Sequence, residues 1–139
     1  QKVIIDINVI SGHGSSDTNA SRADGNWEST DKLYLLSAHE VYGDGTSNHL
    51  SSIDTACNNT RQLDYYKARN VTLDGHWSSA MKWYNIANMT YSWWLRAAHS
   101  GNSNYFLSVD FGGSWFTNAA SHTYGFAPAF RIGENVNNV

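Results

Sequence analysis

The chain is poor in three kinds of residue: it contains one cysteine, one proline and few charged residues. A single cysteine excludes an internal disulfide framework and a zinc cluster built from cysteines. Charged residues make up only 15% of the chain and its net charge is −3, so nothing indicates a surface that neutralises phosphates. No apolar run approaches the length of a membrane-spanning helix. We therefore expect neither a nucleic-acid partner nor membrane insertion.

Aromatic side chains, by contrast, are abundant, with six tryptophans, eight tyrosines and an aromatic content of 14%. Disordered chains are poor in aromatic residues, so this composition predicts a folded protein. A length of 139 residues suits one domain, which we place over residues 1–139, with a first strand and loop over 1–30 and a tail over 133–139. Because the chain begins with Gln1 and shows no signal-peptide pattern, it either follows a processed leader or is a module of a longer protein.

The N-terminal part of the sequence predicts strands separated by a long loop. Residues 2–10 are rich in β-branched side chains at alternate positions, which predicts a strand. Residues 11–29 are rich in glycine, serine, aspartate and asparagine, which predicts a loop anchored by Trp27. Residues 33–36 predict a short buried strand.

Two short helices are expected in the middle of the chain. Ser37 and Glu40 have the spacing of a capping box, so a helix should begin there and end at Gly43. Residues 60–69 have a helix-compatible composition. The side chains predicted to face inward from this second helix are those of Leu63, Tyr66 and Ala68. Residues 70–91 show no regular pattern and are predicted to be irregular.

The last third is typical of an antiparallel meander, because strand-like runs alternate with short turn sequences. These runs cover residues 92–98, 104–111, 114–120 and 125–132. Pro128 lies in the last run and predicts an edge strand, a bulge or a strand end. The fold class is therefore α+β, with an antiparallel sheet, two short helices and long irregular loops. The predicted core consists of Trp94, Leu95, Phe106, Phe126 and Phe130.

No pattern indicates catalysis or a bound cofactor. The chain lacks Gly-x-Ser-x-Gly, Cys57 has no basic neighbour to activate it, and the six histidines show no metal-ligand spacing. Residues 17–24 offer alternating oxygen ligands but lack the closing glutamate of a calcium loop, so a solvated loop is the favoured interpretation. We predict no enzyme activity, no catalytic residue, no metal and no cofactor. A hydrolase with a pair of carboxylates is a weaker alternative.

Three blocks resemble the "WWLRSP … GVRPAF" signature of a domain family of unknown function: SWWLRAA (92–98), YFLSVDFGGS (105–114) and YGFAPAFRI (124–132). Upstream, DKLYLLSAHEVYG (31–43) is similar to the family's "LFLLSxxEVFG" block, and the residues from Tyr65 to Ala68 resemble its "YY" helix. The resemblance covers residues 31–132. It departs at Ala97-Ala98, where Ser-Pro is usual, and at Ala127, where Arg is usual.

That family occurs in phage virion proteins and bacterial surface proteins. It is related to the C-type-lectin-like fold, in the branch that includes formylglycine-generating enzymes and the variable proteins of diversity-generating retroelements. The resemblance implies paired terminal strands, which residues 2–10 and 125–132 would supply, and buried acceptors around Arg96. The copper chemistry of the branch needs two cysteines, and calcium-dependent sugar binding needs Glu-Pro-Asn and Trp-Asn-Asp motifs; this chain has neither.

Together, the resemblance and the loop composition predict a non-enzymatic, C-type-lectin-like attachment module of a phage virion (a tail fibre, head fibre or capsid decoration), located on the virion or at a cell surface. Its expected partner is a bacterial surface or mucus glycan or a protein receptor, with other virion subunits or further copies of the chain beside it. The ligand surface is predicted in loops 99–104, 112–117 and 119–124. The residues expected to contact the ligand are Asn102, Asn104, Tyr105, Trp115, Asn118, His122 and Tyr124. The alternative is a purely structural subunit that assembles with itself in a virion or surface filament.

Overall fold

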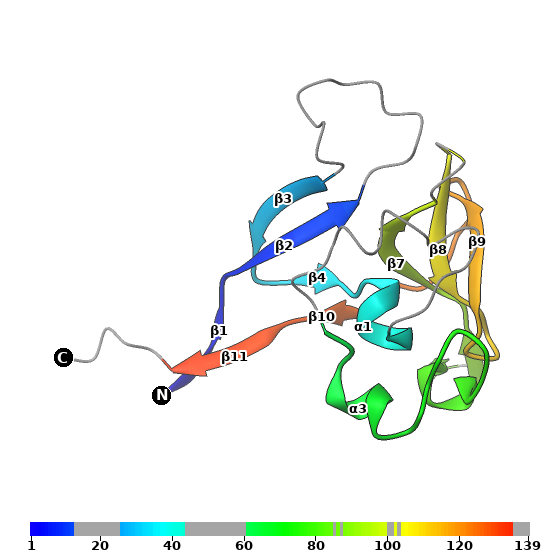
Figure 1. Ribbon diagram of the computed structural model, residues 1–139, viewed down its shortest axis with the longest axis horizontal. Coiled ribbons are helices and arrows are strands. Elements are labelled where there is room, and N and C mark those ends of the chain that lie inside the picture. Colours follow the sequence, from blue (N-terminus) through cyan, green and yellow to red (C-terminus); the bar gives the residue numbers. More distant parts are fainter. Residues whose placement is uncertain are drawn as a thin grey trace.

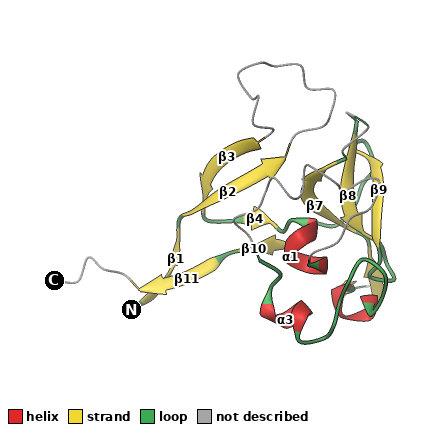
Figure 2. Ribbon diagram, viewed as in Figure 1, coloured by secondary structure: helices red, strands yellow, loops and turns green. Residues whose placement is uncertain are grey.

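Small antiparallel sheets and two short helices make up the described part of the chain in a computed structural model (Figures 1 and 2). The structure describes residues 1–12, 26–43, 61–84, 86, 88–99, 102 and 104–134. Within these residues one sheet has three strands and the others have two. The predicted α+β class is confirmed, with strands dominating.

The three-stranded sheet is the meander that the sequence predicts. It contains β7 (Trp93–Ala98), β8 (Tyr105–Val109) and β9 (Trp115–Ala119), in that spatial order. Alternate residues of a strand point to opposite faces, and one face of this sheet lies on the core. The buried side chains on that face are those of Trp93, Leu95, Ala97, Leu107 and Val109.

Beside this sheet lie β4 (Tyr34–Leu35) and α1 (Ala38–Tyr42). The predicted capping box is confirmed: Ser37 Oγ accepts from the Glu40 N–H at 3.0 Å, and a Glu40 carboxylate oxygen accepts from the Ser37 N–H at 2.8 Å. The helix ends where expected, at Gly43, whose φ of 77° is one that glycine adopts without strain. This helix buries Val41 and Tyr42 in the core.

A side-chain hydrogen bond joins α1 to the turn between β8 and β9. Tyr42 donates its hydroxyl hydrogen bond to the Gly113 carbonyl at 2.7 Å. Gly113 has a φ of 88°, and a Cβ added there would lie 1.9 Å from the Trp77 carbonyl oxygen. The turn itself is closed by Asp110 Oδ1, which accepts from the N–H groups of Gly112 and Ser114.

The segment after residue 60 contains more regular secondary structure than the sequence predicts. It contains α3 (Asp64–Lys67), a 3-10 turn η2 (Trp77–Ala80), and the hairpin of β5 (Lys82–Tyr84) and β6 (Met89–Tyr91). The predicted helix over 60–69 is therefore shorter than expected, with Tyr66 buried as predicted but Ala68 exposed. The prediction of an irregular 70–91 is wrong for the hairpin, whose side chains are largely exposed and so leave no inside–outside pattern in the sequence.

The predicted first strand is two strands that change partner at Asp6. β1 (Lys2–Ile5) pairs with β11 (Arg131–Glu134), whereas β2 (Ile7–Gly12) pairs with β3 (Asn26–Asp31). The predicted loop over 11–29 is thus wrong at both ends, because a polar strand such as β3 has the composition of a loop. Pairing of the N- and C-terminal strands is confirmed for β1 and wrong for β2.

The run 125–132 is not a fourth strand of the meander. β10 (Pro128–Ala129) pairs with β4, and β11 then pairs with β1 (Figure 1). Gly125 contacts the start of β7 instead, where its carbonyl accepts from the Trp94 N–H at 3.1 Å. Pro128 opens β10, so the expected strand end at this proline is confirmed.

The predicted core requires a larger correction. Leu95 is buried as predicted, but Phe106, Phe126 and Phe130 are exposed and Trp94 is only half-buried. Only one of two consecutive tryptophans can face the core of a strand, and that residue is Trp93, which is 2% exposed and donates its Nε1–H to the Ala80 carbonyl at 3.1 Å.

Candidate functional site

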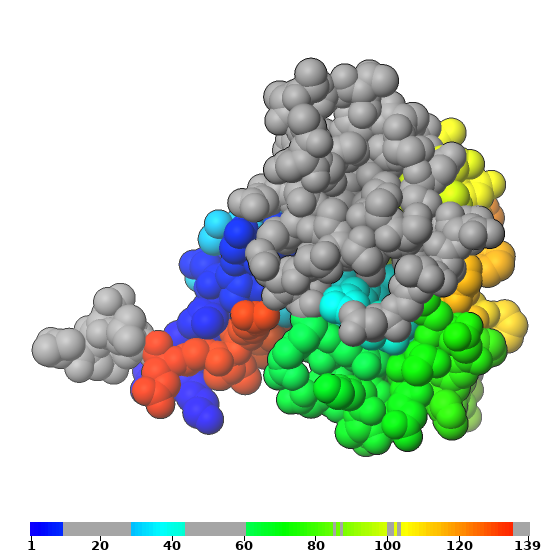
Figure 3. Space-filling view, viewed as in Figure 1, coloured from blue at the N-terminus to red at the C-terminus, as the bar shows by residue number. Residues whose placement is uncertain are grey.

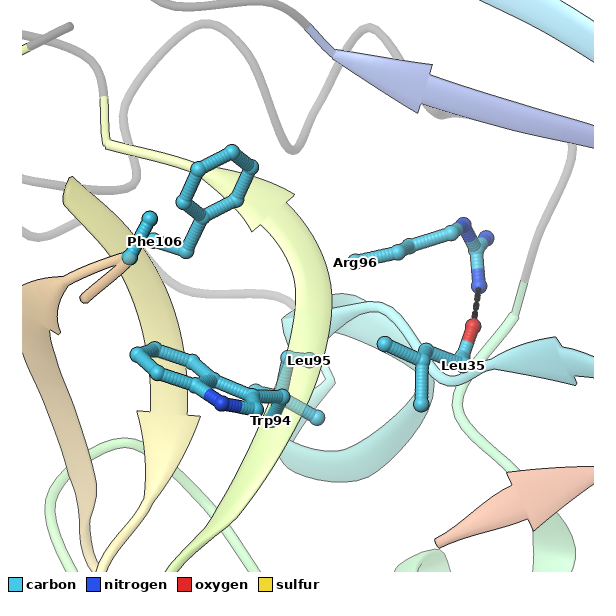
Figure 4. Close-up of a pocket in the computed structure, with 6 residues that line it drawn as sticks. Leu35, Trp94, Leu95, Arg96 and Phe106 are labelled. Atoms are coloured by element: carbon cyan, nitrogen blue, oxygen red, sulfur yellow. Dashed lines mark hydrogen bonds between the residues drawn. The ribbon is translucent and has the colours of Figure 1, made fainter. Parts of the chain in front are cut away.

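The outer face of the β7–β8–β9 sheet, opposite the core, carries an apolar pocket. Its volume is about 270 Å³, and its lining residues are Leu35, Trp94, Leu95, Arg96, Phe106 and Ala120. Figure 4 shows Trp94 and Phe106 on neighbouring strands with their rings on the same side of the sheet, while Arg96 turns toward Leu35. Two aromatic rings and an aliphatic side chain thus form walls that offer few hydrogen bonds.

Side chains at and beside the 119–124 turn lie next to one of the pocket residues, Trp94. The Tyr124 ring packs against Trp94, with ring centroids 4.7 Å apart and planes tilted by 41°. The Asn118 side-chain N–H donates to the Tyr124 hydroxyl at 2.7 Å, and the His122 ring lies 5.9 Å from the Tyr124 ring. The apolar pocket therefore lies beside a polar group of three side chains, Asn118, His122 and Tyr124, which can donate and accept hydrogen bonds.

Arg96 forms one wall, and its position depends on an irregularity in β7. The register shifts between Trp94, which faces Ser108, and Ala98, which faces Phe106. The Arg96 N–H consequently bonds the Leu36 carbonyl at 3.0 Å instead of β8. Its guanidinium donates to the Leu35 carbonyl at 2.8 Å and to the Glu40 carboxylate at 2.5 Å. Both ion-pair side chains are buried, as the family resemblance implied for Arg96.

The predicted ligand residues lie in two groups. Antiparallel pairing places His99, Asn104 and the 119–124 turn at the same end of the sheet, where the Ala120 N–H bonds the Asn104 carbonyl at 2.9 Å. The 112–117 loop and Trp115 lie at the opposite end, because Trp115 pairs with Val109.

The predicted ligand residues are also divided between the two faces of the sheet. Asn118 pairs with Phe106 and so shares the outer face with the pocket, next to Tyr124 and His122. Tyr105 and Trp115 share the core face with Leu107 and Val109, and Trp115 packs against the core. Asn102 lies beyond the end of β8, where its side-chain oxygen accepts from the Asn104 N–H at 3.1 Å.

The sequence did not identify Trp94, Phe106 and Leu35 as pocket residues. All three look like core residues, because aromatic and aliphatic side chains within strands usually face inward. The signal that could have separated them is the Trp93–Trp94 pair itself, which requires one tryptophan on the face away from the core.

Several carboxylates of the described part serve as structural partners. Glu40 pairs with Arg96 and Asp110 closes a turn, while Asp6 pairs with Lys32 at 3.2 Å and Asp64 pairs with Arg61. Hydrogen bonding and charge from Arg61 lower the pKa of Asp64. Among the described residues no group of three or more His, Cys, Asp or Glu side chains could hold a metal ion. Cys57 and the 17–24 loop lie outside the described residues.

The helices within the described ranges are short. None of them has the length and apolar character that crossing a membrane requires.

Comparison with known proteins identifies a family. The family model described as "Domain of unknown function (DUF6273)" matches residues 1–133. The chain therefore belongs to this family of domains of unknown function, and the match extends the expected region over the N-terminal strands. No curated protein and no solved structure matches the chain significantly.

Proposed function

We propose that this domain is a non-enzymatic attachment module that binds a neutral glycan of a bacterial surface or of mucus, as part of a phage virion or a bacterial surface protein. The observation that carries the proposal is the apolar pocket on the outer face of the β7–β8–β9 sheet, together with the polar group that lies beside its Trp94 ring. Its setting on a virion or a cell surface rests on the sequence resemblance alone.

A sugar ring has apolar faces that fit the pocket and polar hydroxyl groups that fit the polar group beside it. Its C–H faces are apolar and stack on aromatic rings such as Trp94 and Phe106, whereas its hydroxyl groups need hydrogen-bonding partners when they are removed from water. Asn118, Tyr124 and His122, beside the pocket, offer both donors and acceptors. The pocket volume of about 270 Å³ is of the order of one sugar ring with its substituents.

Charge on the described walls favours an uncharged ligand. Arg96 is the charged residue among the lining side chains, and its guanidinium is already matched by the buried Glu40 carboxylate. An acidic ligand group would have to compete with that ion pair, which is held in place by the helix cap. A neutral hexose or N-acetylhexosamine avoids this competition.

The finer fold assignment belongs to this proposal as well. A C-type-lectin-like fold brings the two terminal strands together, and the pairing of β1 with β11 supports it. In that arrangement loops project from a scaffold, and the 119–124 turn, whose Tyr124 ring packs against Trp94, supplies such a surface beside the pocket.

A glycan array followed by equilibrium binding to the best neutral glycan tests the proposal. We expect Phe106→Ala and Tyr124→Ala each to weaken binding by at least about tenfold, since truncating an aromatic anchor removes most of its contact. Phe116→Ala is the matched control, because Phe116 is exposed on β9 and does not line the pocket. EDTA should leave binding unchanged.

Pocket variants that bind like the parent, with their folding verified, would contradict the proposed site. The predicted contacts of Tyr105 and Trp115 are tested in the same assay by Tyr105→Ala and Trp115→Ala. If no glycan on the array binds, the structural alternative replaces the attachment module. One observation favours that alternative: apolar side chains are exposed on the β1–β11 pair and on the β5–β6 hairpin.

A further inference from the structure

The pair of strands β1 and β11 extends from the rest of the molecule as a ribbon, which we call the terminal ribbon (residues 2–5 and 131–134). Figure 3 shows it at one end of the molecule, in blue and red. Its register places Ile4 opposite Ile132, and these side chains are 43% and 61% exposed. Among the described strands neither β1 nor β11 has a second neighbour.

A two-stranded ribbon that no other described strand joins is an unusual feature of a folded protein. Each of its strands has an outer edge of backbone N–H and C=O groups, which is a template for pairing with another strand. Isolated two-stranded sheets are also marginally stable in water. Joining another pair of strands through one edge pairs that edge and makes the ribbon half of a larger, more stable sheet.

The charges at the two ends of β1 indicate which strand completes it: Lys2 is its first residue, and Asp6 directly follows its last residue, Ile5. Lys2 and Asp6 lie two residues before and two residues after Ile4. In an antiparallel pair of two β1 strands centred on Ile4, Lys2 of each copy lies opposite Asp6 of the other, and Val3 lies opposite Ile5. Shifting the centre to Lys2 would place two like charges together, and shifting it to Ile5 would place Ile4 opposite Asp6. Only centring on Ile4 pairs Lys2 with Asp6 and also pairs apolar residues with each other at all three positions between them.

The existing contacts of the two charged residues are compatible with this arrangement. Asp6 Oδ2 accepts from Lys32 Nζ at 3.2 Å, and both side chains are largely exposed. A carboxylate has about four lone-pair sites, so Asp6 can accept from a second ammonium group. Lys2 lies opposite Glu134 within the ribbon, so its neighbour on β11 is a residue of opposite charge.

We propose that two copies of this chain join through their β1 edges, with Ile4 opposite Ile4 and Lys2 opposite Asp6. The product is a four-stranded sheet in the order β11, β1, β1, β11. The two copies are related by a two-fold axis, so the same edge serves both. One face of the new sheet carries Ile4 and Ile132 from each copy as a continuous apolar stripe.

Sedimentation equilibrium of the full chain over a range of protein concentrations tests the proposal. We expect a reversible dimer that Lys2→Glu or Asp6→Lys alone weakens by at least about tenfold, because each change places like charges opposite each other twice per dimer. The double variant Lys2→Glu/Asp6→Lys should restore the parental dissociation constant. Circular dichroism and thermal unfolding confirm that each variant is folded.

Two control variants distinguish the β1 edge from the rest of the surface as the site of dimer contact. Glu134→Lys changes the neighbour of Lys2 inside the ribbon but leaves the Lys2–Asp6 match intact, so it should change the dissociation constant by less than about threefold. Ile86→Lys alters the exposed β5–β6 side, where Ile86 is 87% exposed, and should have no effect. A monomeric parent chain, a double variant no tighter than the single ones, or a dimer lost only in Ile86→Lys would each overturn the proposal.

Discussion

The region around α1 and β7 and the terminal ribbon are both built from short segments, but they differ in what holds their side chains. In the first, the Arg96–Glu40 ion pair, the capping box and the Tyr42–Gly113 hydrogen bond are buried and connect three parts of the chain. In the ribbon, backbone pairing holds the strands while Ile4 and Ile132 remain exposed. The difference indicates that stability is concentrated in the α1–β7 region and that the ribbon is available for another role.

The strongest test of this contrast is truncation of the two adjacent tryptophans. Trp93→Ala should lower the free energy of unfolding by about 3–5 kcal/mol, since it removes a fully buried side chain and leaves a cavity. Trp94→Ala, on the half-buried outer face, should cost about 1–2 kcal/mol. Urea denaturation measures both. Equal losses would mean that the two faces of β7 are equally important for stability.

Breaking the buried ion pair should be of similar size. Arg96→Met leaves the Glu40 carboxylate buried without its main partner, which is expected to cost about 3–5 kcal/mol. Replacing both residues, in Arg96→Met/Glu40→Leu, removes the uncompensated charge and should be less destabilising than the sum of the two single changes. A double-mutant cycle by denaturation provides the coupling free energy. Strict additivity of the two changes would show that the pair is not coupled.

Two neighbouring glycines provide a comparison within a single turn. Gly113→Ala should destabilise by about 2–3 kcal/mol, because the residue has a positive φ and its Cβ would collide with the Trp77 carbonyl. At Gly112 the nearest atom to an added Cβ is the Asp110 side-chain oxygen at 3.3 Å, so Gly112→Ala should cost less than about 1 kcal/mol. Thermal unfolding of the two variants decides whether the close approach to Trp77 is the cause.

Alkaline pH should weaken the core specifically. Burial raises the pKa of Tyr66 to about 12 and also raises the pKa of Tyr42. Because the folded-state pKa lies above the unfolded value of about 10, this stabilisation is complete below pH 10 and is lost as the pH rises from 10 toward 12. We expect the free energy of unfolding to fall by about 1–3 kcal/mol across this range, and the fall to be smaller in Tyr66→Phe. A fall of the same size in Tyr66→Phe would assign the effect to other groups.

The smallest effect is expected in the ribbon itself. Ile132→Thr keeps a β-branched side chain at an exposed position, so the unfolding free energy of the monomer should change by less than about 0.5 kcal/mol. Denaturation at a protein concentration well below the dimer dissociation constant measures this change. A loss comparable to that of Trp93→Ala would place the ribbon in the cooperative core and remove the contrast between the two regions.

Local features of the fold could be predicted because neighbouring residues decide them. The capping box, the helix end at Gly43 and the three strands of the meander depend on spacings of a few residues. The change of partner at Asp6 could not be predicted, because β1 and β2 share one continuous alternating pattern and only their distant partners differ. The exposed hairpin was missed for the opposite reason: its side chains do not alternate between inside and outside.

Prediction of the candidate site from the sequence was limited in the same way, by dependence on distant contacts. The sequence indicated the 119–124 loop as part of a ligand surface, and Asn118, His122 and Tyr124 do lie together there. It could not indicate that Trp94 and Phe106 form a pocket beside them, because both are typical core residues. Which face of β7 meets the core is decided by contacts with α1 and η2, and these lie far away in the chain.

The amino-acid sequence is thus enough to define an aromatic-rich α+β domain, its helix cap, its meander and, through three motif blocks, its family. Tertiary contacts decide which of two adjacent tryptophans is buried, where residues 125–132 pair and which loops meet at one end of the sheet. The physical reason is that hydrogen bonds over a few residues are set by local spacing. Burial, in contrast, depends on how separate segments share a limited interior, and no single segment contains that information.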